Sequence, residues 1–158
     1  MTANQGVNLS IELKSSVQEM LGKHLLTCYP HEACGVLLGA AAAGGMRIDN
    51  YLPLRNVAPD PLHAFIPDPA DWIKALYMKP LPIGLFHSHP SSAPWPSTAD
   101  LNGLPSLPAS FQVYLIGSPG VSEGSPLVLN GFYIGQKTNA EGRIDCSLQQ
   151  AELYVLLK

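Results

Sequence analysis

Charged residues are scarce in this 158-residue chain, at 13% of the total, which is about half of their share in an ordinary globular domain. A surface so poor in charge leaves room for a partner-binding face, or for a self-association face that would make a homo-oligomer. The nine Lys and Arg residues are scattered, and the net charge is −3. Because no basic cluster is available to neutralise phosphates, we do not expect the protein to bind nucleic acid.

Long apolar runs and paired cysteines are also missing. The apolar stretches are far shorter than the ~20 residues that span a bilayer, and the N-terminus lacks the basic start and apolar run of a secretory signal. We therefore expect a cytoplasmic protein with no membrane segment. The three cysteines, Cys28, Cys34 and Cys146, form no CxxC pair. This argues against a disulfide scaffold and a cysteine-based zinc site, and predicts that all three are small buried hydrophobic residues.

What remains is an ordinary apolar content of 46%, which suits one domain over residues 1–158 with a disordered start at residues 1–8. Apolar residues at three- and four-residue steps predict a helix over residues 11–28, with Ser10 as its cap and Pro30 as its stop.

Further helices are expected from Asp68 or Asp71 to Met78 and from the N-cap Ser97 onward. Short apolar or alternating runs predict strands at 34–39, 46–57, 83–89, 111–117, 126–135 and 142–148, and a short strand at Phe65 and Ile66. Pro53 indicates an irregularity or an edge, and the type of the amphipathic tail over 148–157 stays open. The interleaved order predicts an α/β (α+β mixed) fold with a single mixed sheet flanked by helices.

Two histidines stand at alternate positions where one predicted strand ends, in Gly84-Leu-Phe-His87-Ser-His89-Pro90. Alternate side chains of a strand share a face, so the two imidazoles can converge on one ion while Ser88 points the other way. Asp100 follows at the first turn of the helix that begins after Ser97, and there it can fold back towards the histidines. Two imidazoles and one carboxylate leave a fourth position for water, as catalytic rather than structural zinc sites do.

A carboxylate that is not a ligand is needed to take the proton from that water. Glu32 is the candidate, because it directly precedes the buried strand that begins at Cys34; if that strand neighbours the histidine strand, Glu32 faces the metal. Ser97 has two compatible roles, as a helix cap and as a donor to the oxygen that gains charge in a tetrahedral intermediate. Each of these residues alone has an ordinary structural explanation. Their order and spacing together favour the metal site.

These residues match a known pattern: an upstream Glu, then His-Ser/Thr-His-Pro, six residues, Ser, two residues and Asp. In this chain the pattern is filled by Glu32, His87-Ser88-His89-Pro90, Ser97 and Asp100. The chain thus resembles the JAMM metalloproteases of the MPN (Mov34/PAD-1) superfamily, and its residues 32–39 resemble that family's Glu-x-x-Gly-x-Leu-x-Gly strand. The resemblance implies a cytidine-deaminase-like sheet and one Zn²⁺ per chain, held by His87, His89 and Asp100. It also implies Glu32 as proton shuttle and Ser97 as oxyanion donor.

Members of that family cut peptide or isopeptide bonds after the C-terminus of ubiquitin or ubiquitin-like proteins. This chain lacks the long insertions of the eukaryotic deubiquitinases and so resembles the compact prokaryotic members, some of which are associated with ubiquitin-like sulfur carriers. By analogy the expected partner is such a carrier. Residues 60–69 are a candidate substrate ledge or a plain surface loop. His63 is expected not to be a ligand, and Trp95 either lines the site or pins its loop.

Three other functions agree less well with these residues. Some superfamily relatives have lost their ligands and only scaffold complexes, whereas all five chemical positions are intact here. A base deaminase would need His-x-Glu and Pro-Cys-x-x-Cys, and the chain has neither. A structural zinc site would need a fourth protein ligand. We therefore expect a zinc-dependent peptidase or isopeptidase, with the non-catalytic scaffold as the alternative.

Overall fold

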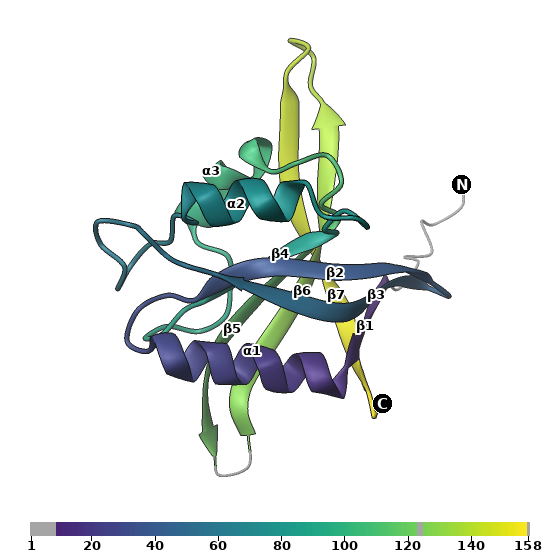
Figure 1. Ribbon diagram of the computed structural model, residues 1–158. Coiled ribbons are helices and arrows are strands. Elements are labelled where there is room, and N and C mark those ends of the chain that lie inside the picture. The colour runs from purple at the N-terminus through teal and green to yellow at the C-terminus, as the bar shows by residue number, and fades with distance from the viewer. Residues whose placement is uncertain (1–8, 123–124, 158) are drawn as a thin grey trace.

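The computed structural model describes residues 9–122 and 125–157; the disorder expected at residues 1–8 lies outside these ranges. The described chain forms seven strands, three α-helices and one 3-10 helix (Figure 1). The strands are β1 (Ser10–Lys14), β2 (Cys34–Ala42), β3 (Gly45–Leu54), β4 (Gly84–Ser88), β5 (Val113–Ser122), β6 (Ser125–Thr138) and β7 (Ile144–Leu156). The helices are α1 (Ser15–Cys28), α2 (Pro69–Leu76), α3 (Thr98–Gly103) and the 3-10 helix η1 (Leu104–Ser106).

All seven strands belong to one mixed sheet in the order β1-β3-β2-β4-β5-β6-β7, which closes because β1 also pairs with β7. Three pairs are parallel, namely β1 with β3, β1 with β7 and β4 with β5, and the other four are antiparallel. The predicted single mixed sheet with flanking helices is confirmed. Its closure through the first and last strands was not anticipated.

The helices lie on opposite faces of the sheet, with α1 on one side and α2 and α3 on the other (Figure 1). Alternate residues of β4 serve the two faces. Phe86 packs in a core that includes Leu21 and Leu25 of α1, whereas Leu85 belongs to a second core with Ala75 of α2. His87 is two residues beyond Leu85 and therefore projects to the α2 and α3 side.

The helix predicted over residues 11–28 is wrong in its first part. Residues Ser10–Lys14 are strand β1, in which Ile11 and Leu13 are buried and their neighbours are not. This two-residue alternation is typical of a strand. It was mistaken for part of the helix because the helical spacing of apolar residues, with Val17 and Leu21, follows it without a break. Ser10 is consequently no helix cap; the N-cap position of α1 is Lys14, which makes no side-chain cap bond.

Most of the other predicted elements are present. Asp68 caps α2, with Pro69 in its first turn, and Ser97 caps α3. The irregularity predicted at Pro53 is wrong: Pro53 pairs in regular register with Gly35, and the β2–β3 register shifts between Leu38 and Gly39 instead. The alternative of an edge fits better, because β1 pairs with β3 only from Gly45 to Ile48 and does not reach Pro53.

Two strand predictions need correction. Phe65 and Ile66 form no strand; the chain makes there only an isolated bridge between Asn56 and Pro67. The last strand, predicted at 142–148, runs on to Leu156 as β7. Its pattern was weak because one face of β7 is exposed, and Ala151 is its single buried position.

The cysteines are all free thiols, and Cys34 is buried as predicted. Cys28 and Cys146 are only partly buried, so the prediction that all three are buried is wrong for these two. Within residues 9–122 and 125–157, none of the helices has the length and apolar character that crossing a membrane requires.

Candidate metal centre

Strand pairing builds one half of the site. β2 and β4 are antiparallel neighbours, with Cys34 opposite His87, so the condition set for Glu32, two residues before Cys34, is met. Ser88 points away from the histidines as expected, and its hydroxyl oxygen accepts a bond of 2.8 Å from the backbone N–H of Ala33. This bond fixes the start of β2, and with it the backbone next to Glu32, against the end of β4.

A helix cap builds the other half. The hydroxyl of Ser97 accepts from the backbone N–H of Asp100 at 3.1 Å, and the Asp100 carboxylate accepts from the backbone N–H of Ser97 at 2.8 Å. This reciprocal capping box holds Asp100 in the first turn of α3. Its carboxylate is thereby turned back towards the two histidines, as the sequence predicted.

Donor atoms of three side chains converge in the site. The Nε2 atoms of His87 and His89 are 3.0 Å apart. Oδ1 of Asp100 lies 3.2 Å from Nε2 of His87, and Oδ2 lies 3.2 Å from Nε2 of His89. Ligands of a tetrahedral zinc at ~2.0–2.1 Å are themselves about 3.3–3.4 Å apart. The three groups therefore fit one metal ion with little movement.

The two imidazoles differ in how deeply they are buried and in the direction of their pKa shifts. His87 is fully buried, and its ring stacks on Phe65 at 4.6 Å and meets the edge of Tyr114 at 5.4 Å. This desolvation lowers the pKa of His87 despite its bond to Asp100. Burial also acts on the less enclosed His89, but its bonds to Asp100 and to the Ala93 carbonyl outweigh that effect and raise its pKa.

The carboxylate of Asp100 stays ionised at neutral pH. Burial would raise its pKa, but the hydrogen bonds from His87 and His89 dominate and lower it far below its usual range. A partly buried carboxylate beside two imidazole nitrogens is a donor set of the kind that divalent zinc prefers.

Glu32 lies at the wall of the same cleft and is held by its backbone on both sides. Its N–H donates to the Pro61 carbonyl at 2.8 Å, and its carbonyl accepts from the Asn56 side chain at 3.0 Å. Burial is the main cause that raises the pKa of the Glu32 carboxyl to about 7; the Asp100 charge adds to it and His89 opposes it. A carboxyl with such a pKa can both take up and release a proton near neutrality.

Asn56, a residue that no sequence motif marks, organises this wall through its carboxamide. It donates to the carbonyls of Glu32 and Ala64 and accepts from the N–H groups of Ala58 and Ile66, all at 3.0 Å. All four hydrogen-bonding positions of the side chain are therefore used. Nothing local signals this role, because its partners lie up to 24 residues away.

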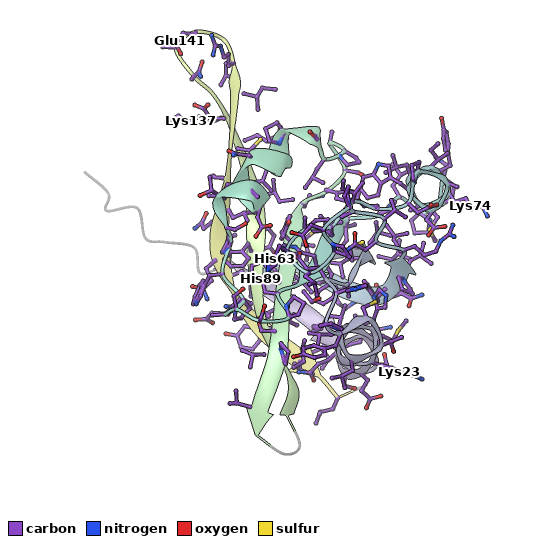
Figure 2. All side chains as sticks on the ribbon, turned by 90° about the vertical axis from the view of Figure 1, so that its left-hand side faces the viewer. Lys23, His63, Lys74, His89, Lys137 and Glu141 are labelled. Atoms are coloured by element: carbon purple, nitrogen blue, oxygen red, sulfur yellow. The ribbon has the colours of Figure 1, made fainter. Side chains whose placement is uncertain are left out.

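The site opens into a cleft of about 790 Å³, lined by Glu32, His89, Ser97 and Asp100 together with residues 62–67 of the predicted ledge. The structure thus brings all five predicted residues together, with His87 buried behind the cleft wall. His63 also lines the cleft, on the same side of the molecule as His89 (Figure 2), and it pairs with Asp60 rather than with the ligands. Trp95 packs on Phe132 with ring centres 6.3 Å apart, outside the residues that line the cleft.

Comparison with known proteins agrees with this geometry. The family of prokaryotic homologs of the JAB domain matches residues 14–124, and the chain belongs to this family. The solution structure of a protein from Desulfitobacterium hafniense shares the fold, with a TM-score of 0.68 and 25% identity over 94% of both chains.

Two curated relatives carry functional names. The chain is 36% identical over 84 residues to a probable TtuB-protein conjugate cleaving protease of Thermus thermophilus, a match that covers 49% of this chain and 52% of the relative. It is 37% identical over 94 residues to the desampylase of Haloferax volcanii, covering 57% of this chain and 64% of that protein. The matches thus span between half and two thirds of each relative.

Proposed function

We propose that this protein is a zinc-dependent peptidase or isopeptidase that cleaves after the C-terminus of a ubiquitin-like protein, with a sulfur carrier as the candidate substrate. The observation that carries the proposal is the convergence of His87, His89 and Asp100 within 3.2 Å in a cleft that Glu32 also lines. The names of the two curated relatives, a conjugate cleaving protease and a desampylase, support the choice of reaction.

In this proposal His87, His89 and Asp100 hold one zinc ion. Zinc, when bound, supplies a Lewis acid that polarises a carbonyl group and acidifies water. Glu32 takes the proton from the attacking water and delivers it to the leaving amine. The Ser97 hydroxyl accepts from the N–H of Asp100 and keeps its own proton to donate to the oxygen that gains charge.

The cleft also supports a chain terminus as substrate. An extended C-terminal tail can lie along residues 62–67, which form one wall of the cleft and lead to Glu32 and the ligands. Phe65, in the middle of this wall, stacks on His87. A tail on this wall would therefore bring its last carbonyl group beside the donor atoms.

The test uses the purified chain with a measured zinc content and candidate ubiquitin-like carriers extended by a short peptide beyond Gly-Gly. Mass spectrometry should find cleavage directly after the second glycine. The variant Glu32→Gln should keep zinc and fold and lose activity by at least ~100-fold, since a general acid-base typically contributes 10²–10⁴-fold. A protein that binds these carriers without cutting them would be the scaffold alternative, and Glu32→Gln with most of its turnover left would remove Glu32 as the base.

A further inference from the structure

The segment between His89 and Asp100 is attached to the sheet by side chains of two strands. The Ser118 hydroxyl, on β5, donates to the Ser92 carbonyl at 2.6 Å, and the Asn130 carboxamide, on β6, donates to the Pro94 carbonyl at 2.9 Å. The backbone N–H of His89 donates to the Gly117 carbonyl at 2.7 Å. The segment is therefore held at its start and at two alternate residues further along.

Between the two side-chain anchors lies Ala93, whose carbonyl accepts from Nδ1 of His89 at 2.9 Å. A proton on Nδ1 leaves Nε2 free of its own proton in the neutral ring, and Nε2 is the atom that faces His87 and Asp100. The Ala93 carbonyl can fix this tautomer only while its own position is fixed. Anchors at Ser92 and Pro94, one residue on either side, provide that restraint.

The two histidines are held in different ways. His87 is enclosed by Phe65 and Tyr114, and its Nδ1 has no hydrogen-bond partner among the described residues. His89 lies just beyond the end of β4 and depends on its bond to Ala93. The orientation of this second imidazole is therefore set by the loop, and the loop is set by β5 and β6.

We propose that Ser118 and Asn130 are positioning residues of the metal site, which hold the Ala93 carbonyl so that it fixes the tautomer and orientation of the His89 imidazole. The inference rests on the proposed function only in taking His89 as a zinc ligand. Hydrogen-bond partners of metal-ligating histidines act in this way in general, and their loss typically weakens metal binding by ~10–100-fold.

The test measures zinc affinity by competition with a chromophoric chelator in the variants Ser118→Ala, Asn130→Leu and the double variant. Ser10→Ala and Asn139→Leu are matched controls. The Ser10 hydroxyl also donates to a backbone carbonyl, that of Gly44, and the Asn139 side chain accepts from the N–H groups of Glu141 and Arg143 at the β6–β7 turn. The double variant should bind zinc ~10–100-fold more weakly than wild type, and the two controls should bind it as wild type does.

A second measurement separates positioning from general loosening. In the zinc-loaded protein the Nδ1 proton of His89, seen by ¹⁵N NMR, should exchange with solvent faster in the double variant than in the controls. Ser118→Thr, which keeps the hydroxyl, should restore the affinity that Ser118→Ala loses. Zinc affinity in the double variant equal to that of the controls would overturn the inference.

The outcomes also distinguish the inference from the proposed function. A wild-type protein that holds zinc and loses affinity in the double variant, yet cuts no carrier, would leave the positioning role intact and remove the peptidase. A wild-type protein that fails to hold zinc would remove both.

Discussion

The two halves of the candidate metal centre are held in place by different contacts. The strand half, with Glu32 and His87, is set by the β2–β4 ladder, by burial and by hydrogen bonds of the Glu32 backbone with Asn56 and Pro61. The loop half, from His89 to Asp100, is set by single side-chain bonds to carbonyls and by a helix cap. This difference predicts that the two histidines of the proposed metal site differ widely in how much their loss destabilises the fold.

The largest difference should come from replacing each histidine by alanine. His87→Ala removes a fully buried ring packed between Phe65 and Tyr114 and should cost about 3 kcal/mol of unfolding free energy through the cavity it leaves. His89→Ala should cost about 1 kcal/mol. Both should lose zinc. Urea denaturation of the metal-free variants measures the difference, and equal destabilisation would show that the two halves are not distinct.

Replacing Ser97 tests whether the loop half contributes to the turnover rate. Ser97→Ala should lower kcat by ~10²–10³-fold if the hydroxyl donates to the developing oxyanion, and should destabilise the fold by only about 1 kcal/mol as a lost cap. Ser106→Ala is the matched control, because Ser106 lines the same cleft outside the cap. Steady-state kinetics with similar rates for the two variants would leave Ser97 as a cap alone.

The pH dependence of stability tests the burial of Glu32 in the strand half. Its pKa is raised to about 7 in the folded protein, against ~4.3 in an unfolded chain. Between these values the folded state binds the proton more tightly, so stability falls as pH rises from about 4.3 to 7. The loss should be about 3–4 kcal/mol in the metal-free protein, since one pKa unit corresponds to about 1.4 kcal/mol. Urea denaturation at several pH values should find no such loss in Glu32→Gln relative to wild type.

The smallest effect is expected at Asn56, which supports the strand half from outside. Asn56→Asp keeps an acceptor for Ala58 and Ile66 but loses the donor to Glu32 and Ala64, which should cost about 1–2 kcal/mol. Turnover should fall while zinc affinity stays unchanged. Asn50→Asp is the control, because the Asn50 carboxamide oxygen accepts one hydrogen bond, from the backbone N–H of Tyr51, and this acceptor is kept in the variant. If zinc affinity falls as far as turnover does, Asn56 supports the whole site rather than Glu32.

The same comparison explains how far the sequence could predict the molecule. Alternation along β4 and the spacing Ser97–Asp100 are local patterns, so the convergence of the ligands and the cap at Ser97 could be predicted. The anchors Ser118 and Asn130 bond to carbonyls 26 and 36 residues away, and no local pattern marks such a contact. This part of the site could be found only in three dimensions.

The fold shows the same division. Elements with one clear period, such as β4 and α2, were predicted within a few residues. β1 was not predicted as a strand, because its two-residue alternation is followed directly by the helical spacing of apolar residues in α1. The length of β7 was missed because its face is mostly exposed and its apolar signal is weak.

The pairing of β1 with β7, between Ser10–Lys14 and residues 152–156, affects how the chain folds. The first strand gains this neighbour only after about 140 further residues have been synthesised, so this pairing must join distant parts of the chain. Contacts of such long sequence separation form slowly. Until they form, β7 presents an unpaired edge, which is the kind of surface that chaperones shield from aggregation.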